Sequence, residues 1–124
     1  MEITWSSDIT YVTGGKHQYP KQHGVYIIFS SSSKKAQYIG QGDINDRMSK
    51  HENDSEINPC VKRVMKNRDD VLVRYAIIPN VDLRNNVEYT AVAIAGLDNL
   101  CNEIMPPEGK LDYTLNIPFL NNLF

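Results

Sequence analysis

The sequence lacks an excess of positive charge. Its 124 residues include 13 Lys and Arg against 15 Asp and Glu, which gives a net charge of −2. Neutralisation of phosphates by basic side chains supplies most non-specific affinity for nucleic acid, so the composition alone does not indicate a nucleic-acid-binding protein. Any such contact has to come from a local basic face. The length fits one domain.

Cysteine is also scarce. Cys60 and Cys101 are the two cysteines, and no C-x-x-C pair is present. Neither a zinc site nor a disulfide framework is therefore indicated. Because both residues have apolar neighbours in the sequence, we expect reduced, structural thiols in a cytoplasmic protein.

Long hydrophobic runs are missing as well. No apolar stretch approaches the roughly 18–20 residues that a membrane-spanning helix needs. The first residues have neither the basic start nor the apolar centre of a signal peptide. We therefore expect no contact with a membrane.

Two short segments rich in β-branched and aromatic residues predict a hairpin. Residues 24–29 and 36–40 have the composition of strands, and a polar turn separates them. A turn centred on Ser32 places Tyr26 directly opposite Tyr38. Because cross-strand partners share one face of a sheet, the two phenol rings are expected to point into the same space.

Helix signals follow the hairpin. Asp43 is suited to cap a helix that carries Arg47 and His51, which lie four residues apart and so share a face. Pro59 is suited to the first position of a second helix that begins near Asn58.

The remaining elements complete an α+β pattern. The apolar run 71–78 predicts a buried central strand, and Asp82 is suited to cap a helix over 83–97 that carries Glu88. The order β-β-α-α-β-α predicts a small α/β sandwich with a three-stranded central sheet flanked by helices. We expect a lead-in segment over 1–23, a domain over 24–105 and a C-terminal tail over 106–124.

Several of these residues together resemble a known signature. Gly24-Val25-Tyr26, then Tyr38-Ile39-Gly40 after a short turn, then Arg47 on the next helix, is similar to the signature of the GIY-YIG nuclease family. His51 follows the arginine by one helical turn, as in some members, and Glu88 matches the glutamate of a later helix. Asn102 is the better match, and Asn99 the weaker, to an asparagine beyond that helix. Val25 departs from the usual isoleucine, conservatively.

The resemblance implies a metal-dependent endonuclease with one active site per chain. The catalytic set would be Tyr26, Tyr38, Arg47, His51, Glu88 and Asn102. Glu88 would hold one divalent ion, Mg²⁺ or Mn²⁺, since such an ion keeps several waters and needs few protein ligands. Tyr26 would take a proton from water, and a neighbouring cation would lower its pKa from about 10. No organic cofactor is implied.

Binding to DNA and self-association are the further expectations. Candidate contacts to the DNA backbone are the basic residues Lys34, Lys35, Lys50, Lys62 and Arg63, which are equally compatible with a scattered, solvated surface. The apolar tail, residues 117–124, would either form a homodimer contact or fold back onto its own core. DNA is the substrate that the family implies, although RNA also fits.

A second function remains open from the sequence. The acidic net charge, and the lack of room for a separate DNA-reading domain, are also compatible with a catalytically inactive GIY-YIG-like module. Such a module would bind DNA or a protein partner without cleaving it. Each half of the signature is by itself a common strand tripeptide, so the functional interpretation depends on whether these side chains meet in space.

Overall fold

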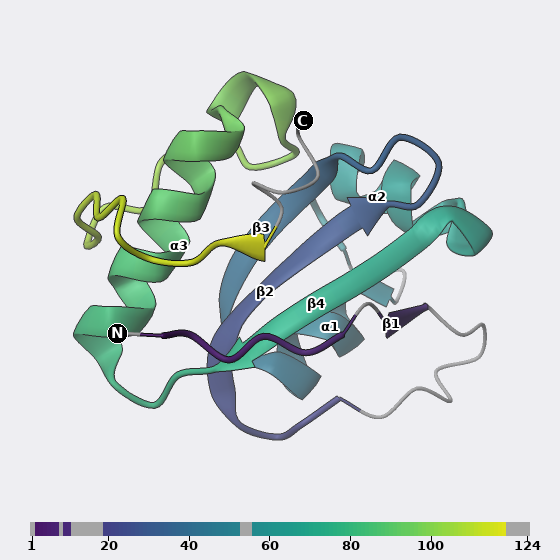
Figure 1. The fold of residues 1–124 in the computed structure, drawn as a ribbon. Helices are drawn as coiled ribbons and strands as arrows, with labels where there is room; N and C mark the ends of the chain where they lie inside the picture. Colours follow the sequence, from purple (N-terminus) through teal and green to yellow (C-terminus); the bar gives the residue numbers. More distant parts are fainter. Residues whose placement is uncertain (1, 8, 11–18, 53–55, 119–124) are drawn as a thin grey trace.

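A computed structural model describes residues 2–7, 9–10, 19–52 and 56–118 of the chain. The expected α+β sandwich is confirmed (Figure 1). Its helices and strands, in chain order, are β1 (Ile9–Thr10), β2 (His23–Ser30), β3 (Ala36–Asp43), α1 (Ile44–Glu52), α2 (Pro59–Lys66), β4 (Val71–Ile77) and α3 (Val81–Ala95).

The sheet is antiparallel with the strand order β1-β4-β2-β3. Its three long strands are those expected, with β2 and β4 both internal. The two-residue strand β1, which was not predicted, extends the sheet beside β4. Strand β3 lies at the other edge, and the candidate site forms along this edge.

The hairpin register differs from the expected one. Tyr26 pairs with Gly40, and Tyr38 pairs with Ile28, so the two tyrosines are diagonal neighbours and not direct partners. Phe29 pairs with Ala36, which centres the turn between Ser32 and Ser33 and moves the pairing by one residue. An irregularity between Ile28 and Phe29 leaves Gln37 without a partner on β2 and moves it by one more. A shift of two preserves the face on which each side chain lies. The tyrosines therefore still share a face.

Alternate residues of β2 enter two separate cores. On one face, Val25 and Ile27 pack in a cluster with Val87 and Ala91 of α3. On the other face, Tyr26 and Ile28 pack in a cluster that contains residues of α1 and α2. Figure 1 shows α3 covering the first face and α1 and α2 lying behind the sheet. The pocket described below lies where these two layers meet at the edge of β3.

Helix ends are set largely by the residues expected, with one exception. Asp43 accepts the backbone N–H of Asp46 at 2.9 Å, as a capping residue does. Asn58 caps α2, and Pro59 begins it. The expected helix over 83–97, behind Asp82, is displaced at both ends: Asn80 caps α3 by accepting the N–H of Leu83, and the helix runs Val81–Ala95, with Gly96 after it.

The cysteines are not the free thiols that the sequence indicated. Cys60, in the first turn of α2, forms a disulfide with Cys101, which follows α3, and their Cα atoms are 5.3 Å apart. The pairing joins residues separated by 41 positions, which no local motif predicts. The expectation of reduced thiols, on which a cytoplasmic protein was inferred, is thereby removed, and the compartment stays a prediction.

None of the helices in the described residues combines the length and apolar character that crossing a bilayer requires. Within the C-terminal tail, Leu115 and Ile117 are buried in the core that α3 covers. Ile3, from the lead-in segment, belongs to the same cluster. Residues 119–124, on which the homodimer prediction mainly depends, lie outside the described residues.

Candidate functional site

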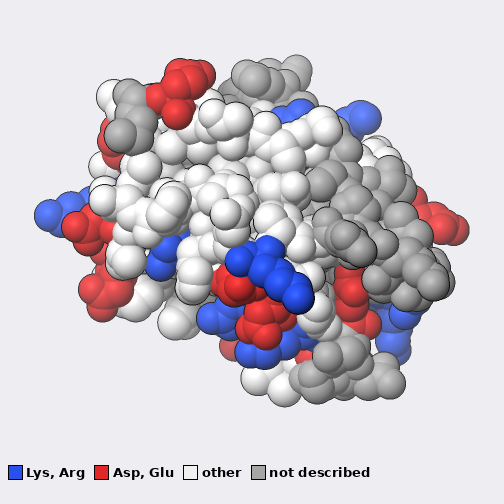
Figure 2. All heavy atoms as spheres, turned by 90° about the horizontal axis from the view of Figure 1, so that it is seen from below, with Lys and Arg blue, Asp and Glu red and all other residues white. Residues whose placement is uncertain are grey.

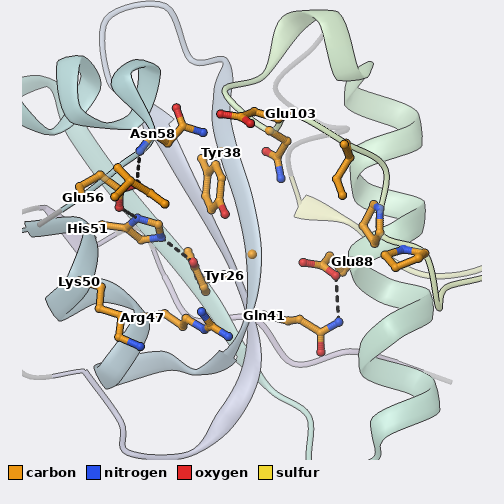
Figure 3. Close-up of a pocket in the computed structure, with 16 residues that line it drawn as sticks. Tyr26, Tyr38, Gln41, Arg47, Lys50, His51, Glu56, Asn58, Glu88 and Glu103 are labelled. Atoms are coloured by element: carbon orange, nitrogen blue, oxygen red, sulfur yellow. Dashed lines mark hydrogen bonds and ion pairs between the residues drawn. The ribbon is translucent and has the colours of Figure 1, made fainter.

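All six predicted catalytic residues, Tyr26, Tyr38, Arg47, His51, Glu88 and Asn102, border one cavity of about 690 Å³. Strands β2 and β3 supply the tyrosines, α1 supplies Arg47 and His51, and α3 supplies Glu88 (Figure 3). Further lining residues are Gly40, Gln41, Lys50, Glu56, Ile57, Asn58, Glu103, Ile104, Pro106 and Pro107.

The glycines of the two strand tripeptides are required by close packing. A Cβ atom at Gly24 would lie 2.0 Å from the backbone carbonyl oxygen of Ala76 on β4. A Cβ atom at Gly40 would lie 2.3 Å from the hydroxyl of Tyr26. The phenol ring thus packs directly over the backbone of β3, and Gly40 is the residue that leaves room for it.

We expect Gly40→Ala to lower the free energy of unfolding by about 1–3 kcal/mol, the usual cost of overpacking. Tyr26 is 1% exposed, so its ring cannot move aside into solvent. Urea unfolding of the variant measures the change. Gln37→Ala, on the same strand, is the control and should unfold close to the native midpoint. If Gly40→Ala shared that midpoint, the close packing of Tyr26 on Gly40 would be contradicted.

Helix α1 presents Arg47 and His51 to the cavity from the same face. The Tyr26 hydroxyl lies 2.6 Å from Nε2 of His51, and both side chains are buried. Tyr38 packs its ring against His51, with ring centroids 5.0 Å apart, and against Tyr26 at 6.2 Å. Arg47 is exposed, so its guanidinium is available to a ligand in the cavity. The two phenols and the imidazole therefore form one contiguous cluster.

Glu88 approaches the cavity from the other layer of the sandwich. Helix α3 covers the opposite face of the sheet, and the half-buried side chain of Glu88 lies across β3 from Tyr26 and His51 (Figure 3). Gln41 of β3 donates from Nε2 to Oε1 of Glu88 at 2.9 Å, and accepts a hydrogen bond from Nε of Arg84. The carboxylate is thereby held at the edge strand, where it borders the same cavity as the phenols.

Asn102 has its polar atoms committed to the backbone of β3. Its side-chain oxygen accepts the N–H of Ile39 at 3.0 Å, and its side-chain nitrogen donates to the carbonyl of Ile39 at 2.7 Å. The neighbouring Cys101 N–H donates to Gln37 O. An edge strand exposes unpaired backbone groups, and Asn102 satisfies two of them. In this arrangement it holds the strand that carries Tyr38.

One residue of the cluster was missed from the sequence. Glu56 lies in the segment before α2, and its Oε2 is 2.6 Å from Nδ1 of His51. The side chains of His51 and Glu56 are 8% and 9% exposed. Glu56 follows His51 by five positions and lies outside any helix. Helical periodicity therefore does not relate the two residues, and their contact could not be predicted from the sequence.

Among the groups of the chain itself, burial outweighs the lowering of the Tyr26 pKa that a neighbouring cation was expected to give. Burial raises the pKa of Tyr26 well above its ordinary value, and the neighbouring Tyr38 raises it further. Arg47 acts in the expected direction but is outweighed. Burial likewise raises the pKa of Tyr38. Tyr26 is thus a neutral phenol at neutral pH and needs a specific partner to accept its proton.

His51 and Glu88 are shifted mainly by burial. Burial lowers the pKa of His51, although the hydrogen bond and the charge of Glu56 oppose this. The imidazole is therefore neutral near pH 7 and able to accept a proton. Burial raises the pKa of Glu88, while the hydrogen bond from Gln41 and the charges of Arg47 and Arg84 favour the ionised form.

The site offers few metal ligands, and they are oxygen atoms. No three His, Cys, Asp or Glu side chains gather as a metal-binding group in the part of the chain that the structure describes. A Mg²⁺ or Mn²⁺ ion that keeps most of its waters needs only one or two carboxylates. Glu88 and the volume of the cavity fit an ion of this kind, held with waters beside a phosphate.

The five basic residues predicted to track DNA do not gather around the cavity. Lys50 borders it and pairs with Asp46 at 3.3 Å, while Arg63 borders a separate hollow. Lys34 and Lys35 lie in the exposed hairpin turn, and Lys62 is exposed on α2. On the face shown in Figure 2, basic side chains are interspersed with acidic ones. Whether these residues contact DNA stays a prediction.

Comparison of the chain with family models, with curated proteins and with solved structures finds no match.

Proposed function

We propose that this chain is a phosphodiester hydrolase. Within that class, it would be a metal-dependent endonuclease of the GIY-YIG type that cuts DNA, with one active site per chain. The observation that carries the proposal is the convergence of Tyr26, Tyr38, Arg47, His51 and Glu88 on one cavity. These residues come from four segments, and packing alone does not require all five to line the same cavity.

The roles follow from the chemistry of each group. Hydrolysis of a phosphodiester needs a base for the attacking water and neutralisation of the charge that develops on phosphate. Arg47 offers a planar, permanently charged fork that matches phosphate oxygens. Tyr26 takes a proton from water as it passes its own proton to His51, 2.6 Å away. Tyr38 would orient the water or the phosphate through its hydroxyl.

Glu88 would hold the divalent ion. When bound, such an ion supplies a Lewis acid that stabilises charge on the phosphate and on the leaving oxygen. Gln41 keeps the carboxylate of Glu88 at the edge of β3, on the side of the cavity opposite His51. In these roles the base and the metal ligand would act from opposite sides of the cavity, which agrees with attack and departure on opposite sides of a phosphorus atom.

The proposal is tested by incubating the native chain with supercoiled plasmid in Mg²⁺ or Mn²⁺. We expect nicked circles to accumulate before linear DNA, because one site cuts one strand at a time, and EDTA should abolish the cleavage. A parallel panel of linear, branched and single-stranded DNA and of RNA defines the substrate. An absence of cleavage of every substrate in either metal ion would refute the proposal.

One observation favours the inactive binding module as a second candidate. The cavity is lined by three carboxylates, those of Glu56, Glu88 and Glu103, and by two cations, Arg47 and Lys50. Without a bound metal ion this balance repels a phosphate. Metal-independent binding of a partner without turnover would support the module, whereas metal-dependent cleavage would remove it.

A further inference from the structure

The inference concerns Glu56, whose carboxylate is buried and bound at both oxygens. Oε2 is 2.6 Å from Nδ1 of His51, and Oε1 accepts the backbone N–H of Asn58 at 3.0 Å. A buried carboxylate is costly unless it is paired and hydrogen-bonded, and hydrogen bonds to an ionised group are among the strongest in proteins. Glu56 is therefore a fixed acceptor beneath the imidazole.

The residue that holds Glu56 is itself held from two sides. Asn58 caps α2 by accepting the N–H groups of Cys60 and Val61. Its side-chain nitrogen donates to the carbonyl oxygen of Cys101 at 2.9 Å. The position of Glu56 thus depends on a helix cap and on the segment that follows α3.

This arrangement decides which nitrogen of His51 carries the proton. An ionised carboxylate only accepts hydrogen bonds, so Nδ1 of His51 must donate to Glu56. In the neutral imidazole Nε2 is then the acceptor, and it faces the hydroxyl of Tyr26 at 2.6 Å. Without Glu56 both tautomers are available, and the alternative one would direct an N–H at the Tyr26 oxygen.

We propose that Glu56 is a positioning residue of this site: it keeps the proton of His51 on Nδ1 so that Nε2 can take the proton of Tyr26. The inference rests on the proposed nuclease function. As the water loses a proton to the Tyr26 oxygen, the Tyr26 proton moves to Nε2 of His51. The water oxygen then bonds to phosphorus, the ester P–O bond breaks, and the leaving oxygen takes a proton from solvent.

The charges around His51 assign this role to Glu56. Proton transfer leaves a positive charge on the imidazole. Glu56 is the carboxylate in hydrogen-bond contact with that ring, whereas Glu88 and Glu103 lie elsewhere around the cavity (Figure 3). Arg47, on the same helix as His51, opposes the new charge. The remaining titratable neighbours, Tyr26 and Tyr38, are both protonated phenols near neutral pH.

The first test reads the tautomer directly and does not depend on cleavage. Nitrogen-15 NMR of histidine-labelled native chain distinguishes a protonated from an unprotonated ring nitrogen. The chain has three histidines, and the signals that disappear in His51→Gln belong to His51. We expect the Nδ1–H form in the native chain and in the control Glu103→Gln, and a mixture of tautomers in Glu56→Ala. The Nε2–H form in the native chain, or an unchanged tautomer in folded Glu56→Ala, overturns the proposal.

The second test is the pH dependence of plasmid cleavage by Glu56→Gln, which keeps the shape of the side chain and removes its charge. We expect kcat to fall by about 10- to 100-fold, the range for removal of a group that orients a functional residue, with KM unchanged. The acid limb of the pH–rate profile, where the rate falls because His51 becomes protonated, should move to lower pH. The reason is that the Glu56 charge raises the pKa of His51, and the substitution removes this charge. Glu103→Gln should leave the limb in place.

The two proposals fail in distinguishable ways. If the native chain cleaves DNA and Glu56→Gln matches it in rate and acid limb, the role of Glu56 is refuted and the nuclease function stands. If the native chain cleaves nothing, the nuclease function is refuted. The tautomer experiment then still decides whether Glu56 directs the proton of His51.

Discussion

Replacing Glu88 with Gln is expected to lower the cleavage rate by about 10³-fold, because a metal ion supplies several kcal/mol of transition-state stabilisation. The substitution keeps the length and shape of the side chain and removes the charge that would hold the ion. Gln41 bonds one oxygen of Glu88, and an amide oxygen at position 88 can still accept that bond. The fold should therefore survive while metal binding is lost.

Two measurements separate this expectation from a general loss of structure. Cleavage of supercoiled plasmid, measured over a range of Mn²⁺ concentrations, gives the loss in rate and in apparent metal affinity. Urea unfolding checks that the variant is folded. Asp82→Asn is the matched control, since Asp82 is exposed in the first turn of the same helix and does not line the cavity. Cleavage by Glu88→Gln at the native rate would exclude Glu88 as the metal ligand.

Local patterns sufficed to predict most of the fold. Successive residues of β2 and β3 point to opposite faces of the sheet, as the predicted strands require. This holds even though the register of the hairpin differs from the predicted one. The extra residue, Gln37, shifts the pairing by one position, and a turn centred between Ser32 and Ser33 shifts it by another; no feature of the polar turn indicates either shift. A shift of one would have turned Tyr38 to the opposite face from Tyr26, so the shared face depends on the register of the hairpin and not on strand composition alone.

The parts of the site that depend on tertiary contacts were beyond the reach of sequence spacing. The spacing of Tyr26, Arg47 and His51 in the sequence predicted that they share one site, and all three line the same cavity. Glu56 contacts His51 from a segment outside any helix or strand, so neither helical nor strand periodicity predicts the contact. The neutral state of Tyr26 also follows from three-dimensional burial, which outweighs the charge of Arg47. The start of α3 was misjudged because Asn80 and Asp82 are both competent caps.

The disulfide is the feature that most changes the stability expected from the sequence. Cys60 and Cys101 join the start of α2 to the segment that follows α3, and the hydrogen bond from Asn58 to Cys101 links the same two segments. Each segment carries residues of the cavity, with Glu56 and Asn58 on one side and Asn102 on the other. Cleaving the bridge removes a constraint on the unfolded chain without removing any of these hydrogen bonds.

We therefore expect reduction of the disulfide to lower the free energy of unfolding by about 4 kcal/mol, the chain-entropy estimate for a loop of this length. For a domain of this size that loss corresponds to a fall of roughly 10–20 °C in Tm. Thermal unfolding with and without dithiothreitol measures it. The double variant Cys60→Ala/Cys101→Ala is the control: it should unfold at the reduced protein's temperature and be insensitive to the reductant. If the unfolded, non-reduced chain contained two titratable thiols, the bridge would be absent. If reductant left the Tm unchanged, the bridge would not stabilise the protein.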